Sequence, residues 1–164
     1  MSYPVVRHLA QYAHLALIAT LILPWHAQAA GFRLLQIADP GYKDLQVGLW
    51  YPTRQPPASE PNTEFGLSVA LEAPIANTNG GLILISHGFG GWYAGHADTA
   101  AALADAGYIV AAPSHTGNTW SDMSSSLDQW MIDRPRHVGW CLHRNNNFQS
   151  VKFPVSVFRC DRNA

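Results

Sequence analysis

A glycine-rich stretch, LILISHGFGGW at residues 82–92, carries the clearest chemical pattern in the chain. A run of branched apolar residues ends at His87, and a loop containing three glycines follows at once. Glycine lets a backbone N–H approach a ligand closely and adopt a positive φ. A fixed N–H aimed at the oxyanion of an attacked ester carbonyl stabilises the transition state by roughly 3 kcal/mol. The loop is therefore a candidate oxyanion-binding loop. The plainer alternative is that Gly88, Gly90 and Gly91 only make a tight strand-to-helix turn.

A nucleophile that would complete such a site is not evident. Acyl-transfer enzymes often place a serine in a G-x-S-x-G turn between a strand and a helix, and this pattern is absent from the 164 residues. The nearest stretch, GLSVA at residues 66–70, ends in alanine and precedes the glycine-rich loop, so it indicates a loop or an edge strand. Ser86 and Ser114 each follow a predicted strand without a sharp turn.

Three histidines, His87, His96 and His115, could suggest a metal site. Their spacing fits no common ligand pattern. We therefore expect no metal, since solvated or loop histidines are far commoner than ligands.

The elements that must position the loop can be predicted from hydrophobic patterning. Residues 31–37 and 45–52 are predicted as two strands of an antiparallel hairpin, with a Pro-Gly turn between them. A proline-rich loop follows, and residues 67–75 form a possible extra strand.

A parallel βαβ unit is predicted around the glycine-rich loop. Residues 82–86, LILIS, begin with four branched apolar residues without alternation, which is typical of a strand buried on both faces. Residues 93–107 have helical spacing of alanines, and Gly107 is placed to end that helix in a left-handed conformation. Residues 108–113 form the second strand. The chain is therefore predicted to have an α/β fold.

The C-terminal part of the chain loses this regularity. Leu127, Trp130 and Met131 begin a further helix, which Pro135 is expected to interrupt. Residues 138–164 have no helical period, so we divide the chain into a domain at residues 30–137 and an unrelated tail of uncertain structure from Val138. Cys141 and Cys160 lie in this tail, either as one disulfide or as two free thiols.

Composition and the N-terminus limit the class of protein. A net charge of −1, with no basic patch, gives no reason to expect nucleic acid as a partner. Residues 1–29 read as a secretory signal peptide, with an apolar run followed by Ala27-Gln28-Ala29. That run is short for a bilayer span, so we expect cleavage after Ala29 and a periplasmic or secreted product, rather than a membrane anchor.

The ordered motifs resemble the α/β-hydrolase superfamily, and more narrowly the secreted bacterial proteins grouped with platelet-activating factor acetylhydrolases and dienelactone-hydrolase-like esterases. The resemblance covers residues 31–137. It rests on LQVGLWYPT, on the strand ending in Ser-His-Gly-Phe-Gly-Gly, on the strand ending in Ala-Pro-Ser-His, on Gly-Asn-Thr and on WMIDRP.

The resemblance implies hydrolysis of small acyl esters, including lipid esters, by a Ser-His-Asp triad without a cofactor. It assigns the backbone N–H of Phe89 as an oxyanion donor, with His87, Gly88, Gly90 and Gly91 shaping the loop. The stretch VGWCLHR is similar to the cysteine elbow of dienelactone hydrolases, which makes Cys141 a candidate nucleophile. However, His143 stands where that elbow needs a small residue, and no buried strand precedes it.

The resemblance therefore implies an α/β-hydrolase fold that is truncated or frame-shifted near His137. Such a chain would carry the oxyanion loop without a nucleophile and would be inactive. The alternative is a non-catalytic secreted binding domain or a non-functional fragment.

Overall fold

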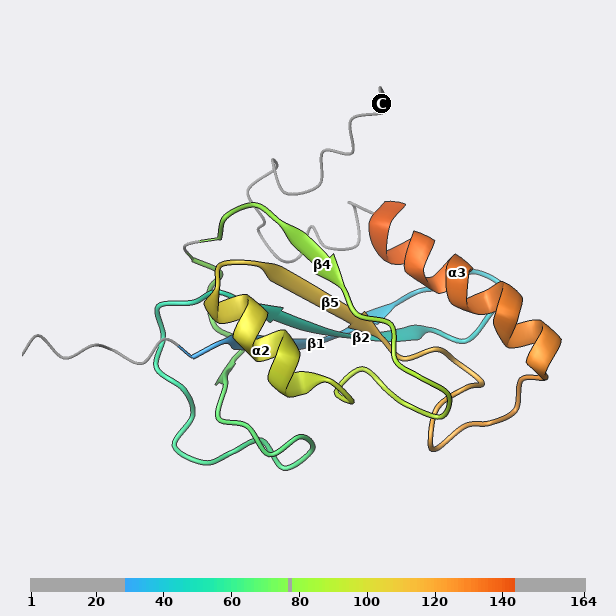
Figure 1. The fold of residues 1–164 in the computed structure, drawn as a ribbon, viewed down its shortest axis with the longest axis horizontal. Helices are drawn as coiled ribbons and strands as arrows, with labels where there is room; N and C mark the ends of the chain where they lie inside the picture. The colour runs from blue at the N-terminus through green and yellow to red at the C-terminus, as the bar shows by residue number, and fades with distance from the viewer. Residues whose placement is uncertain (1–28, 77, 144–164) are drawn as a thin grey trace, which may run out of the picture.

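The computed structural model of the protein describes residues 29–76 and 78–143. In this part of the chain a five-stranded mixed sheet packs against two helices, α2 and α3 (Figure 1). The strand order is β3-β1-β2-β5-β4, so β5 lies between β2 and β4. The α/β prediction is confirmed, and the arrangement is that of part of an α/β-hydrolase fold.

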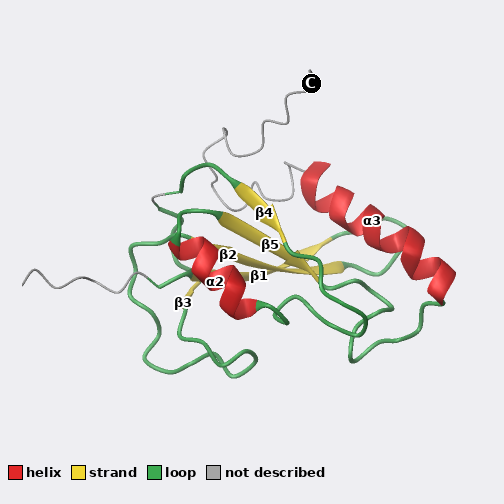
Figure 2. Ribbon diagram, in the orientation of Figure 1, coloured by secondary structure: helices red, strands yellow, loops and turns green. Residues whose placement is uncertain are grey.

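The predicted N-terminal hairpin is present. Strands β1 (Gly31–Ile37) and β2 (Leu45–Tyr51) pair antiparallel in a register that joins Gly31 to Tyr51 and Ile37 to Leu45. The possible extra strand is reduced to β3 (Ala70–Leu71), which pairs parallel to β1. The connection from β2 to β3 is a long loop, drawn green in Figure 2.

The predicted βαβ unit is also present. Strands β4 (Leu82–Leu84) and β5 (Ile109–Pro113) pair parallel, and helix α2 (Ala97–Asp105) connects them. Gly107 has a φ of +97°, the left-handed conformation expected at a helix end.

One burial prediction for this unit is wrong. Strand β5 is buried throughout, whereas all three residues of β4 are only half-buried. The reason is that β4 lies at the edge of the sheet formed by the described residues, so it has a neighbouring strand on one side only.

Alternation along β5 assigns one helix to each face of the sheet. Val110 and Ala112 pack in one apolar cluster with Ala97, Ala100 and Ala104 of α2. Ile109 and Ala111 pack in a second cluster that contains Cys141 of α3. Successive strand residues point to opposite faces, so α2 and α3 cover opposite faces of the sheet.

Helix α3 (Leu127–His143) differs from the prediction. It continues through Pro135 and beyond the predicted domain boundary, to His143. Pro135 lacks the N–H that would bond the carbonyl of Met131, a local cost. The burial of Cys141 against the sheet and hydrogen bonds from Arg134 and Arg136 hold the helix on both sides of the proline. The rest of the predicted tail, residues 144–164, lies outside the described residues.

Within the described ranges, no helix is both long and apolar enough to cross a membrane. The predicted signal peptide lies almost entirely in residues 1–28, outside those ranges.

Candidate functional site

Polar residues converge at one edge of the sheet. Strand β1 is antiparallel to β2, β2 is antiparallel to β5, and β5 is parallel to β4. Strands β1, β4 and β5 therefore point the same way, and their carboxyl ends meet at one edge. Asp39 follows β1, Ser86 and His87 follow β4, and Ser114 and His115 follow β5. Crevices outside strand carboxyl ends are the usual ligand sites of open α/β sheets.

The glycine-rich loop forms a closed turn at this edge. The Gly91 N–H donates to the Gly88 carbonyl over 3.2 Å, and Gly90, at the third position, has a φ of +66°. A turn with positive φ at this position strongly favours glycine. Phe89 occupies the second position, and 72 % of its surface is exposed.

Two side chains hold the carbonyl side of this turn. The His87 Nδ1 lies 2.7 Å from the Gly88 carbonyl oxygen, and Arg134 donates to the same oxygen over 3.0 Å. Arg134 also donates to the His87 carbonyl. In a trans peptide the C=O and the next N–H point in opposite directions, and the chain has no cis peptide among its described residues. The Phe89 N–H therefore points away from these bonds, and none of the described residues accepts a hydrogen bond from it.

The remaining loop residues have structural roles. A Cβ on Gly91 would lie 2.9 Å from the Cβ of His87, so glycine is needed for the loop to pass that ring. Nothing lies within 4 Å of a Cβ built on Gly88. Of the two alternatives expected for these histidines, His87 and His115 are loop residues and are not solvated, since they are only 3 % and 0 % exposed. They are buried because their rings pack together, with centroids 4.7 Å apart, and because the His115 N–H donates to the His87 Nε2 over 3.0 Å.

A chain of polar groups runs from Ser86 into the protein. The Ser86 hydroxyl lies 2.8 Å from the His115 Nε2, and the His115 Nδ1 lies 3.2 Å from the Nδ1 of His137. The His137 Nε2 lies 3.0 Å from Arg136, which also bonds Asp39. The rings of His115 and His137 are nearly parallel, at 13°. We call Ser86, His115, His137 and Arg136 the imidazole chain.

The proton positions in the imidazole chain follow from Arg136. A guanidinium only donates hydrogen bonds, so the His137 Nε2 accepts, and neutral His137 carries its proton on Nδ1. That proton points to the Nδ1 of His115, which must accept. Neutral His115 therefore carries its proton on Nε2 and donates it to the Ser86 oxygen. The His87 Nε2 accepts the His115 N–H, so neutral His87 carries its proton on Nδ1 and donates it to the Gly88 carbonyl. The 3.3 Å approach of Arg134 to that Nδ1 is then a contact and not a second hydrogen bond.

Burial keeps these imidazoles neutral. Removal from water, together with the neighbouring His87, Arg134 and His137, lowers the pKa of His115 to about 3. Burial likewise lowers the pKa of His87 and of His137. At neutral pH Ser86 therefore accepts a hydrogen bond from His115 and is not deprotonated by it. A nucleophilic serine needs the opposite arrangement, with the base accepting its proton.

An ion pair anchors the inner end of the imidazole chain. The Asp39 side chain is only 3 % exposed, and its carboxylate lies 2.5 Å from the Nη1 of Arg136. Arg136 also lies 3.3 Å from Asp133 and stacks over the Tyr42 ring at 4.0 Å. The turn between β1 and β2 is thereby fixed to helix α3.

Cys141, the other candidate nucleophile, lies inside α3 rather than on a strand-to-helix turn. Its thiol is buried, and this burial raises its pKa to about 12. A thiol in this state stays protonated at neutral pH, whereas a nucleophilic cysteine needs a thiolate. Cys160, its possible disulfide partner, lies outside the described residues.

The described residues include no group of three histidine, cysteine or acidic side chains that could hold a metal ion. At this edge the Phe89 N–H and the exposed Ser86 hydroxyl can each donate a hydrogen bond to a ligand oxygen.

Sequence reasoning missed Asp39, Arg134 and His137. Asp39 could have been found from its place just after the first strand, at the edge where the other strands also end. Arg134 and His137 lie on α3, 47 and 22 residues from their partners His87 and His115. No local pattern links positions so far apart.

Comparison with known proteins supports the fold. No protein-family model matches the chain. No curated protein sequence matches it either. Among solved structures, a ferulic acid esterase from Streptomyces cinnamoneus is similar, with a TM-score of 0.55 and 21 % sequence identity over 85 % of this chain. The match covers 50 % of the esterase chain, so the present chain corresponds to about half of that structure. At this identity the likeness is one of fold: the chain has part of the fold of an α/β-hydrolase-type esterase.

Proposed function

We propose that this chain supplies the oxyanion loop of a carboxylic ester hydrolase of the platelet-activating factor acetylhydrolase type, acting on small acyl esters that include lipid esters. The observation that carries the proposal is the fixed Phe89 peptide. Its carbonyl partner at Gly88 is held by His87, Arg134 and Gly91, while the N–H is left open at the carboxyl edge of the sheet.

The fixed peptide stabilises charge that develops during ester cleavage. When the ester carbonyl is attacked, its oxygen becomes an oxyanion, and the Phe89 N–H donates to it. Because the Gly88 carbonyl is bonded on the opposite side, the peptide does not have to reorient as the charge forms. A donor already in position stabilises the transition state more than the ground state.

The nucleophile in this proposal comes from outside the described residues. The Ser86 hydroxyl accepts a hydrogen bond from His115 and has no base among the described residues to take its proton, and the Cys141 thiol is buried. The chain as printed is therefore expected to show no turnover above background on a short p-nitrophenyl ester. Products of the gene read through the His137 codon in the other two frames are tested alongside it, and one that carries G-x-S-x-G is expected to turn over.

In such an active product, Phe89→Pro is expected to lower kcat by about 10²–10³-fold, the effect of removing one oxyanion donor. Proline removes the N–H, yet it suits the second position of a turn closed by a glycine of positive φ. The measurement is kcat and KM on the p-nitrophenyl ester.

The matched control is Phe89→Ala, which keeps the N–H and removes only the exposed ring. It is expected to change kcat by less than about tenfold, because a uniform loss of binding raises KM instead. The proposal is wrong if Phe89→Pro and Phe89→Ala behave alike, or if no reading frame yields an ester hydrolase.

We also propose that the protein is exported. The support is the apolar run that ends in Ala27-Gln28-Ala29. N-terminal sequencing of protein from the periplasmic or culture fraction is expected to begin at Ala30. A mature protein that still begins at Met1 would contradict the proposal.

A further inference from the structure

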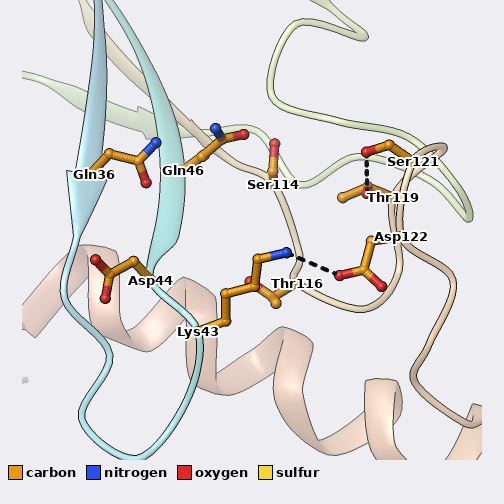
Figure 3. A pocket seen from close by; sticks show the side chains of 9 residues that line it. All are labelled: Gln36, Lys43, Asp44, Gln46, Ser114, Thr116, Thr119, Ser121 and Asp122. Carbon is orange, nitrogen blue, oxygen red and sulfur yellow. Dashed lines mark hydrogen bonds and ion pairs between the residues drawn. The ribbon is translucent and has the colours of Figure 1, made fainter.

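A polar groove lies between the β1–β2 hairpin and the segment that follows β5 (Figure 3). Its main hollow has a volume of about 380 Å³, and a second hollow of about 180 Å³ adjoins it. Four residues line both hollows, namely Gln46, Ser114, Thr119 and Ser121. The two hollows therefore form one continuous surface, which we call the hairpin groove.

The wall of the hairpin groove is rich in groups that both donate and accept hydrogen bonds. Gln36 and Gln46 are register partners on β1 and β2, and both are exposed. Their side-chain amides have no hydrogen-bond partner among the described residues. Facing them across the groove in Figure 3 are the hydroxyls of Thr119 and Ser121, with Ser114 between the two sides. Amides and hydroxyls suit a ligand whose own groups donate and accept.

The charges of the hairpin groove disfavour an anionic ligand. Lys43 is the single basic residue among the lining residues of the two hollows, and Asp44, Asp122 and Glu64 oppose it. The Lys43 ammonium already lies 3.5 Å from Asp122. Hydrogen bonds from Ser124, together with Lys43, lower the pKa of Asp122, which therefore stays ionised. A phosphate or carboxylate ligand would meet more negative than positive charge here.

Two indole rings border the second hollow. Trp120 lies at the tip of a turn closed by hydrogen bonds in both directions between Thr119 and Asp122, of 2.8 and 3.1 Å. The turn is thus held in place while 71 % of the Trp120 surface stays exposed. Trp92 is half-buried, and its ring packs edge-on against Tyr93 at 4.8 Å. An ordered, exposed indole offers a flat apolar face beside the polar wall.

We propose that the hairpin groove binds a neutral saccharide of a few sugar units. A pyranose ring presents C–H groups on its faces, which suit an indole, and hydroxyls on its rim, which suit glutamine amides and serine or threonine hydroxyls. An open, hydroxyl-lined groove with few charges matches such a ligand better than a fatty chain, which needs an apolar cavity. The inference goes beyond the ester-hydrolase proposal and does not depend on it, because binding requires no nucleophile.

The test is calorimetric titration of the full chain with four neutral probes, namely cellotetraose, xylotetraose, mannotetraose and maltotetraose. At least one is expected to bind saturably with a Kd of about 1 mM or below. Trp120→Ala and Gln46→Ala are each expected to weaken that binding by about tenfold or more. Both side chains are exposed, so both variants keep the fold.

The matched control is Gln55→Ala, which removes an exposed glutamine that does not line the hairpin groove. It is expected to leave the Kd unchanged. The proposal is overturned if none of the four probes binds at about 10 mM, if Trp120→Ala binds as the parent does, or if choline binds at the groove while the saccharides do not.

Discussion

Arg136→Met is expected to lower the free energy of unfolding by roughly 3–5 kcal/mol, the usual cost of leaving one member of a buried ion pair without its partner. The Asp39 side chain is 3 % exposed, and Arg136 lies 2.5 Å from its carboxylate. Methionine retains much of the apolar length of arginine, so the loss falls mainly on the uncompensated carboxylate. Chemical denaturation at pH 7 measures the effect.

The double variant Arg136→Met/Asp39→Asn supplies the control. It also removes the Asp39 carboxylate charge that Arg136→Met leaves without a partner. Because the two positions are coupled, the double variant is expected to regain a large part of the lost free energy of unfolding. Lys43→Met, which removes an exposed ion pair to Asp122, is expected to cost less than about 1 kcal/mol. Equal losses for Arg136→Met and Lys43→Met would show that Asp39 is not a buried, paired carboxylate.

The second large effect is a loss of stability in mild acid. The unfolded chain binds protons at its histidines near pH 6.5, whereas burial lowers the pKa of His115 to about 3 in the folded protein. Below about pH 6.5 the unfolded state therefore binds more protons than the folded state. As the pH is lowered, the free energy of unfolding decreases by up to about 1.4 kcal/mol per pH unit for each such histidine. His87 and His137 act in the same direction. The stabilisation is complete above about pH 6.5, and the His115 part is fully lost only near pH 3.

Denaturation curves measured from about pH 7.5 down to about pH 4.5, a range that spans the ordinary pKa of histidine, test this expectation. His115→Gln removes one titrating group, so its stability is expected to depend less steeply on pH than that of the parent. Gln55→Ala removes an exposed side chain that does not titrate and is expected to keep the parental slope. A parent protein whose stability does not change over this range would contradict the neutral imidazole chain.

The local elements of the fold could be predicted because each depends on neighbouring residues. Two short strand-like segments with the Pro40-Gly41 turn between them predicted the β1–β2 hairpin, alanine spacing predicted α2, and Gly107 marked the end of that helix. The length of α3 could not be predicted in this way. Pro135 is a correct local signal for interruption, but packing of Cys141 against the sheet and the bonds of Arg134 and Arg136 outweigh it.

Of the candidate site, only the glycine-rich loop could be predicted from the sequence. The glycine-rich loop is contiguous, so its residues point to a backbone donor, and the assignment of Phe89 stays a prediction. The imidazole chain joins Ser86, His115 and His137, which come from three separate elements. Their proton positions depend on Arg136, so histidine spacing alone could not decide between solvated and buried loop histidines.

The strand order also determines how the chain can assemble. The β1–β2 hairpin and the β4–α2–β5 unit each bring together residues that are close in sequence. Within the sheet they are joined through β2 and β5, where Val47 pairs with Pro113. The chain between these two residues forms a long loop when they pair. Closing that loop costs conformational entropy before the new contacts compensate for the cost. During synthesis, one edge of β2 in the hairpin therefore stays without a partner strand until β5 has left the ribosome.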